Sequence, residues 1–322
     1  MMRCHLFMGT NPIQCDVTLE EGLAAPESSN LWVDIVDPEE SDLDLLRNQF
    51  HFHHLAIEDS HNEQRRSKYE HYATHNFVVI NALDRTTELD PLDLVAISMF
   101  VRPRLLVTVR PKKALVVERV LDHVQQDPDA GVHTTESLLH AIIDAVVDEF
   151  LPLLDGYEEE LTNLQRRVGE AGTDVPGRLV EIRRELLVVR RIILPHLEVI
   201  RRLTDPETTD ISPEIRLYFR DVLDHAMIVS DTDALLLEVV NGALQLHSNM
   251  VNERLNEVMK FLTITSVVML PWTVISGIFG MNFEIIPIAH QRYGFYVALL
   301  AMLGSGAGLF WYFRRKGWTH RP

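Results

Sequence analysis

No charged residue occurs between Phe261 and Met281, a run of 21 residues that limits the folds open to the whole chain. A helix rises about 1.5 Å per residue, so this run would extend about 30 Å, which is the hydrocarbon thickness of a bilayer. A second uncharged run follows from Tyr293 to Phe313 after a short link. We therefore expect two transmembrane helices over these runs, joined by a loop at 282–292 on the far side of the membrane.

The charges that flank the two runs predict their orientation. Lys260 precedes the first run and Arg314 to Lys316 follow the second, whereas Glu284 and Arg292 are the fixed charges of the link. Because basic residues are retained on the cytoplasmic side, both termini should be cytoplasmic, with 314–322 as a basic tail. The first residues lack the apolar core of a secretory signal, so we expect a multi-pass protein of the cytoplasmic (inner) membrane.

The rest of this 322-residue chain is long enough for a substantial domain outside the membrane. The formal charge of −17 is concentrated before residue 250, which argues against nucleic acid as a partner and favours cations. Acidity that only keeps the domain soluble is an equal alternative. Cys4 and Cys15 are too few for a disulfide framework or a thiolate metal site, and this usage is typical of a reducing compartment.

Residues 1–133 are predicted to form a cytosolic α/β domain. β-branched and aromatic residues gather in short runs separated by charged or Pro-containing breaks, which predicts strands that pair in one sheet. These runs lie at 31–36, 77–83, 94–101 and 105–110. Apolar residues at helical spacing predict helices at 39–50 and 112–126.

Residues 134–211 are predicted to form a long antiparallel pair of helices. The first runs from Thr134 to about Val168 with Pro152 as its strong breaker. The second runs from Arg178 to about Leu203, with pairs of arginines facing outward past Leu186, Val189 and Ile193. The run Glu158 to Glu160 offers three carboxylates to a cation, but such a charge run is more often a solvated helix face.

A stalk helix at 212–260 should continue directly into the first transmembrane helix. Ser212, Pro213 and Glu214 form a good helix start, and no comparable stop occurs before Gly277. Apolar residues recur every seven positions, the spacing of a helix that packs against copies or neighbours of itself. We expect the stalk helices of the assembled copies to bundle through these positions, which are Val222, Val229, Leu236, Ala243 and Met250.

Polar and small residues form a stripe along the membrane end of this helix. Its members are Asn256, Met259, Thr263, Leu270, Thr273 and Gly277. Polar groups at membrane depth normally face protein or water, so the stripe predicts a pore lining. The plainer alternative is that the hydroxyls bond back to their own helix. Two crossings cannot enclose a channel, which predicts symmetric association of several chains.

Asn282 would end this stripe at the mouth of the pore. Its amide oxygen is a hard, uncharged ligand, and weak binding by a ring of such groups is what conduction requires. Gly280 permits a turn that other residues cannot make.

Several segments carry a resemblance to a known family. They are Asn252, Asn256 to Thr263, Pro271 to Thr273 and Gly277 to Glu284, together with Glu58, Asp59 and Arg66 to Tyr72. In these segments the chain resembles the CorA family of magnesium transporters, with Ser67 where proline is usual. The resemblance implies a homopentamer with a cytosolic α/β funnel domain, a stalk helix that becomes the pore-lining first crossing, and a second crossing outside it.

The resemblance also implies roles for individual residues. It places Leu270 where a methionine is frequent, and it gives pore and selectivity positions to Asn256, Met259, Thr263, Thr273, Gly280, Met281 and Asn282. Glu284 would attract cations to the external loop, which lacks the second acidic residue usual after its proline.

Mg²⁺ would be both the transported ion and a regulatory ion bound between cytosolic domains, and no organic cofactor is expected. Asp221 matches one regulatory carboxylate that the resemblance implies, whereas Gln245 stands at the position of another. Asp231 and Asp233 are further candidates on the same stalk.

Two other functions compete with magnesium transport. The 15 histidines suggest zinc transport by a relative of the ZntB type, although the intact Gly280 to Glu284 segment does not. A membrane-anchored metal-dependent hydrolase would take its zinc ligands from His51, His53, His54, Glu58, Asp59 and His61. His53 and His54 cannot point the same way on a helix or strand, which favours structural histidines. We therefore expect a transporter of Mg²⁺, with Co²⁺ or Ni²⁺ as further cargo, rather than an enzyme.

Overall fold

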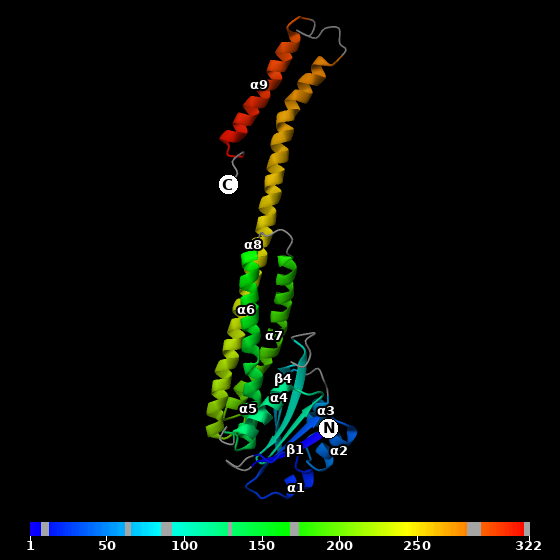
Figure 1. Ribbon diagram of the computed structural model, residues 1–322, viewed down its shortest axis with the longest axis vertical. Helices are drawn as coiled ribbons and strands as arrows, with labels where there is room; N and C mark the ends of the chain where they lie inside the picture. The colour runs from blue at the N-terminus through cyan, green and yellow to red at the C-terminus, as the bar shows by residue number, and fades with distance from the viewer. Residues whose placement is uncertain are drawn as a thin grey trace. The chain divides into compact units, whose positions relative to one another are not determined.

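The computed structural model describes residues 1–7, 13–61, 66–84, 92–127, 131–167, 174–281 and 291–318 (Figure 1). Its internal contacts divide the chain into two compact units, Met1–Ala243 and Leu244–Pro322. The long helix α8 (Pro213–Phe279) contributes residues to both units.

The first unit is built on a six-stranded sheet. Its strands are β1 (Met2–Phe7), β2 (Asn30–Val36), β3 (Lys68–Tyr72), β4 (His75–Leu83), β5 (Leu94–Arg102) and β6 (Leu105–Arg110). The order is β1-β2-β6-β5-β4-β3, with β2 and β6 parallel and the other neighbouring strands antiparallel. The four predicted strands are confirmed. The two that were not predicted, β1 and β3, are the edges of the sheet, where short and partly exposed strands give a weak apolar signal.

Helices cover both faces of this sheet, which is why its central strands are buried almost throughout. The shorter helices are α1 (Leu19–Ala24), α2 (Glu40–Asn48), α3 (His54–Ser60) and α4 (Leu115–Gln126). Leu46 and Ala56 bring α2 and α3 into one core with Val33, Phe100 and Val107. The opposite side of the same strands is also buried, and α5 (Thr135–Asp148) packs against the sheet.

A buried ion pair joins β2 to β6. Arg110 donates to both carboxylate oxygens of Asp34, at 3.2 and 2.7 Å, and both side chains are at most 1% exposed. Thr108 donates to Asp34 at 2.7 Å, and Glu118 of α4 accepts from Arg110 at 2.8 Å. Partial burial raises the pKa of Glu118, but hydrogen bonds from Arg3 of β1 and from Arg110 outweigh this and hold it at about 2. The network is satisfied from several elements, as a buried charge requires.

The predicted pair of long helices is present, but its first member is interrupted. It consists of α5 and α6 (Phe150–Arg167), which meet at Glu149. Pro152 has no N–H to donate to the carbonyl of Asp148, so a break one turn before the proline is expected. The second member is α7 (Val175–Thr204), in which Leu186, Val189 and Ile193 are buried.

The Glu158 to Glu160 run is explained by the contact of α6 with α7. Arg178 of α7 donates to both carboxylate oxygens of Glu160, at 2.6 and 2.8 Å. Glu158 and Glu159 are exposed. The run is thus one ion pair between helices and two solvated carboxylates.

Three of the five heptad positions of α8 form part of the core of the first unit, whereas Ala243 is half-buried and Met250 is exposed. Val222 and Val229 are fully buried and Leu236 is 3% exposed, all within a single chain. The prediction that these residues join the stalks of different copies is therefore wrong for all three. Aromatic contacts of His140 with Tyr218 and Phe219 show that this part of α8 packs on α5.

Among the described residues, two helices are long and apolar enough to cross a membrane, and their apolar parts lie in the second unit. They are the end of α8 and α9 (Gly294–Arg315), and the helix ends at Phe279, Gly294 and Arg315 lie within two residues of the predicted Met281, Tyr293 and Phe313. The fold class is confirmed: an α/β unit, a long helix continuous with the first crossing, and a second crossing.

Candidate functional site

The predicted pore stripe is exposed along α8. Met259 is 59% and Leu270 65% exposed, and Asn256, Thr263 and Thr273 are exposed as well. A Cβ atom added to Gly277 would meet nothing within 4 Å. The stripe therefore presents a free surface in the single chain.

The face of α8 opposite to the pore stripe is partly covered within the second unit. The half-buried residues there are Ile264, Val268, Pro271, Ile275 and Phe279. At about 3.6 residues per turn these positions and the pore stripe lie on opposite faces of the helix. The pore stripe thus points away from the face that packs within the chain.

Two threonines of the stripe bond back to their own helix. Thr263 donates to the carbonyl of Met259 at 2.7 Å, and Thr273 donates to that of Met269 at 3.1 Å. This is the geometry expected if the hydroxyls of the stripe only bond back to their own helix. It still leaves the hydroxyl oxygens as acceptors on the exposed face, which suits contact with the water shell of a cation.

Trp272 makes the contact between α8 and α9. Its indole N–H donates to the carbonyl oxygen of Met302 at 2.6 Å. A Cβ atom added to Gly306 would lie 2.9 Å from Cζ2 of the indole, so the ring rests on the glycine. No local pattern of residues predicts this contact, because it joins residues in two different helices.

The segment Gly280 to Asn282 is described only in part. Gly280 donates its N–H to Ser276 at 2.9 Å, and a Cβ atom there would come within 3.1 Å of the same carbonyl oxygen. Met281 is 50% exposed. Asn282 and Glu284 lie outside the described residues, so their expected roles remain predictions.

The three regulatory candidates on α8 differ in exposure. Asp221 and Asp231 are exposed, as is Gln245, which donates to Asn249 at 3.1 Å. Asp233 is 0% exposed within a single chain. That placement does not fit a cation shared between two chains, so the structure contradicts the expectation for Asp233.

The structure brings together a group of possible metal ligands that the sequence analysis missed. Asp144 and Asp148 of α5 and His225 of α8 have ligand atoms that all lie within 4.8 Å of one another. Nδ1 of His225 is 3.4 Å from Asp148. Burial and the charge of Asp148 raise the pKa of Asp144, and Asp221 is close enough to raise it further. The spacing of four residues places both aspartates on one face of α5, which is the only part of this group visible in the sequence.

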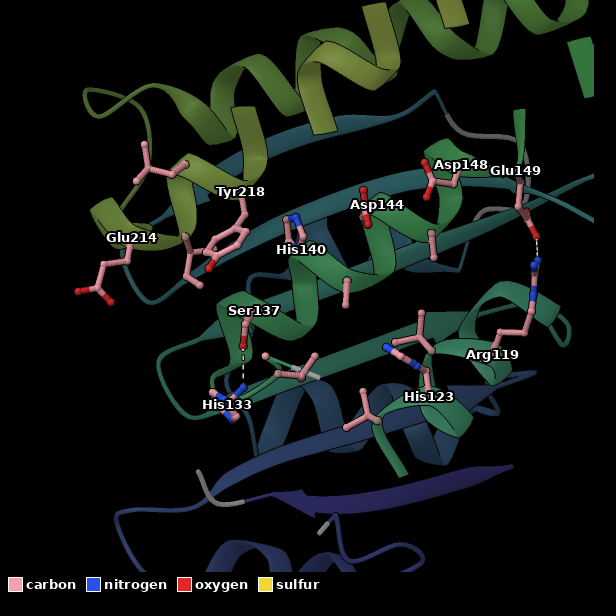
Figure 2. A pocket seen from close by; sticks show the side chains of 18 of the residues that line it. Arg119, His123, His133, Ser137, His140, Asp144, Asp148, Glu149, Glu214 and Tyr218 are labelled. Atoms are coloured by element: carbon pink, nitrogen blue, oxygen red, sulfur yellow. Dashed lines mark hydrogen bonds and ion pairs between the residues drawn. The ribbon is translucent and has the colours of Figure 1, made fainter. Parts of the chain in front are cut away.

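Asp144 and Asp148 line a groove of about 1390 Å³ in the first unit (Figure 2). Figure 2 shows both side chains on α5, with Glu214 and Tyr218 of α8 beside the same groove. Arg119 pairs with Glu149 at one end, and His133 donates its backbone N–H to Ser137 at 2.9 Å. The groove is open to solvent rather than an enclosed cleft.

Of the histidines near residue 53, His53 has a structural role, whereas His51, His54 and His61 are exposed. Nδ1 of His53 caps α3 by accepting the N–H of Leu55, and its ring stacks on Tyr72. His75 also stacks on Tyr72, and burial lowers the pKa of His75 to about 4. Among the described residues, the histidines at 51–61 belong to no group with metal-ligand spacing.

Comparison with known proteins agrees with this arrangement. A family model described as CorA-like Mg2+ transporter protein matches residues 27–315. The cobalt/magnesium transport protein CorA of Thermotoga maritima is 29% identical over 296 residues, which is 90% of this chain and 84% of that protein. A zinc transport protein ZntB of Pectobacterium carotovorum is 23% identical over 242 residues, 75% of this chain and 73% of that protein.

A solved structure shows the same fold. The CorA magnesium transporter from Methanocaldococcus jannaschii has a TM-score of 0.81 at 19% sequence identity, and the match covers 98% of each chain. The family match covers most of the sequence and the structural match nearly all of it. The protein therefore belongs to the CorA family of divalent metal ion transporters.

Proposed function

We propose that this protein carries Mg²⁺ across the cytoplasmic membrane through a pore lined by the exposed stripe of α8. The stripe carries the proposal, because it exposes amide, thioether and hydroxyl groups on the face opposite to the one packed within the chain. Such groups at membrane depth require water or another protein surface. Five copies, the number that the family resemblance implies, would enclose these stripes, with both termini in the cytoplasm.

The proposed outer selectivity ring is formed by Asn282, with Gly280 and Met281 beside it and Glu284 attracting cations. Neutral oxygen ligands suit a hard cation that keeps part of its water shell. Among the described residues the stripe offers no cysteine or histidine that would favour Zn²⁺.

Zinc transport is the second candidate, because relatives named as zinc transport proteins also match this chain. Measuring metal ion flux into liposomes distinguishes magnesium transport from zinc transport. Mg²⁺, Co²⁺, Ni²⁺ and Zn²⁺ are supplied in turn to the reconstituted protein, and Mg²⁺ should enter at the highest rate.

The variant Asn282→Ala tests the pore in the same liposomes. It should abolish Mg²⁺ flux while gel filtration still shows the assembled protein, and Asn249→Ala, outside the stripe, should keep the rate of the unchanged chain. Normal flux through Asn282→Ala would refute the selectivity ring. Zn²⁺ entering faster than Mg²⁺ would favour the second candidate.

We also propose that Mg²⁺ regulates transport by binding to the first unit. Asp144, Asp148 and His225 offer three ligand atoms close together, and Asp221 is near enough to affect Asp144 electrostatically. Carboxylates suit Mg²⁺, and the imidazole also admits Co²⁺ or Ni²⁺. A cation there would link α5 to α8, the helix that continues into the pore stripe.

A further inference from the structure

We propose that Trp272 is a positioning residue for metal ion passage. Its indole fixes the rotation of α8 about its own axis against α9, so that the pore stripe faces away from α9. This inference rests on the proposed function, since it assumes that the stripe lines the pore.

The contact of Trp272 with α9 is directional and close. The indole N–H donates to the Met302 carbonyl at 2.6 Å, and a Cβ atom at position 306 would come within 2.9 Å of the ring, closer than side chains normally approach. Ser305 donates its hydroxyl to the same carbonyl at 2.8 Å. Gly304 and Gly308 stand two residues to either side of Gly306, and a Cβ atom at either would meet nothing within 4 Å. The fit therefore depends on Gly306 alone among these three glycines.

The half-buried residues of α8 supply little preference for one rotation of the helix over another. Ile264, Val268, Ile275 and Phe279 are apolar, as are Leu270, Val274 and Ile278 on other sides of the helix. In a membrane the lipid tails are as apolar as these side chains, so burying one apolar face rather than another changes the free energy little. The indole N–H differs, because at that depth it needs an acceptor within the protein.

The position of Trp272 along the crossing also differs from that of a tryptophan that anchors a helix at the membrane surface. Tryptophans of the aromatic belts lie at the ends of a crossing. Trp272 is near the middle of the uncharged run from Phe261 to Met281, and its N–H is bonded to protein. Thr273 is the next residue, about 100° further around the helix, so fixing the indole also fixes this pore position.

The test measures the rotation by thiol labelling in the full-length assembled protein. Cys4 and Cys15, the native cysteines, are first changed to serine, and single variants Thr273→Cys and Ile275→Cys are then exposed to a water-soluble thiol reagent. Thr273→Cys should react and Ile275→Cys should be protected. The ratio of the two rates reports which face of α8 meets the aqueous path.

Variants of the contact should change this ratio. Trp272→Leu should reduce it roughly three- to thirtyfold, the range expected for one interhelical hydrogen bond in a membrane, and Mg²⁺ flux should fall with it. Trp272→Phe keeps a ring on Gly306 but lacks the N–H, and should give a smaller change. Gly306→Ala should reduce the ratio in the unchanged background but have no further effect when combined with Trp272→Leu. Gly304→Ala and Gly308→Ala are the matched controls and should leave it unchanged.

The outcomes separate this inference from the proposed function. Equal ratios in the parent, Trp272→Leu and Trp272→Phe proteins, with Gly306→Ala behaving like Gly304→Ala, would overturn the role of Trp272 while leaving the pore stripe intact. A parent in which Thr273→Cys does not react would instead refute the pore stripe, and with it the premise of this inference.

Discussion

Asp233 is a fully buried carboxylate on α8, and neither of its oxygens has a hydrogen-bond partner among the described residues. Burial raises its pKa to about 6, and the charge of Arg190 opposes this in part. The difference from the ordinary value of 3.8 corresponds to roughly 3 kcal/mol. Above that pH the folded chain contains an ionised carboxylate in an unfavourable environment.

The substitution Asp233→Asn should therefore stabilise the protein at pH 8 and have a much smaller effect at pH 4. Because the folded-state pKa is raised, protonation favours the folded chain. This contribution is complete below about pH 4 and is lost as the pH rises through about 6. Thermal unfolding in detergent at the two pH values measures the difference. Asp231→Asn, an exposed neighbour, is the control, and equal stabilisation by Asp233→Asn at both pH values would contradict the prediction.

At the scale of elements, α8 has two apolar faces in the first unit with different roles. Val222, Val229 and Leu236 face the core of their own chain. Leu217, Ile228 and Leu235 are 61%, 52% and 60% exposed. Their spacings of 11 and 7 residues place these three on one line along the helix. We propose this exposed line, rather than the heptad positions, as the contact between stalks.

Adjacent leucines on α8 provide a matched test of these faces. Leu236→Asp should lower the stability of each chain by about 3 to 5 kcal/mol, because it places an unpaired charge in the core. Leu235→Asp should change the stability of a single chain by less than about 0.5 kcal/mol but weaken assembly. Thermal unfolding and mass measurement in detergent distinguish the two effects. Dissociation caused by Leu236→Asp without unfolding would restore the heptad face as the contact.

At the scale of the whole molecule, metal regulation requires that cation binding in the first unit change the behaviour of α8. The ligand group of Asp144, Asp148 and His225 joins α5 to α8, and its nearest members across the two helices, Asp148 and His225, are 77 residues apart in the sequence. A cation there would favour the conformation in which α5 and α8 are in contact. Removing it would free α8, and coupling of this kind needs only a difference in affinity between two states.

Millimolar Mg²⁺ should therefore protect the full-length protein from proteolysis. Combining Asp148→Ala with Asp221→Ala should raise the Mg²⁺ concentration needed for half protection by at least about tenfold, since even changes around metal ligands cost that much. Asp224→Ala, an exposed carboxylate of the same helix, is the control. An unchanged midpoint in the double variant would exclude this group as the sensor and leave the acidity as a source of solubility.

The sequence by itself determined the two crossings, the continuous stalk, the α/β class and the family resemblance. These depend on local properties: a charge-free run of a certain length, a helix start without a stop, and short motifs such as Gly280 to Asn282. Hydrophobic periodicity also identified Val222, Val229 and Leu236 as buried residues of α8, because an apolar stripe must be covered by something, but Met250 at the same spacing is 46% exposed.

Only the tertiary structure decided what covers each stripe. Periodicity cannot distinguish a face packed within the chain from a face packed on another copy, so Val222, Val229 and Leu236 were assigned to the wrong partner. The meeting of Asp144 with His225, and of Trp272 with Gly306, joins segments that are distant in sequence and share no local signal. Such contacts depend on the rotation of each helix about its axis, and that rotation is fixed by all of its packing partners together.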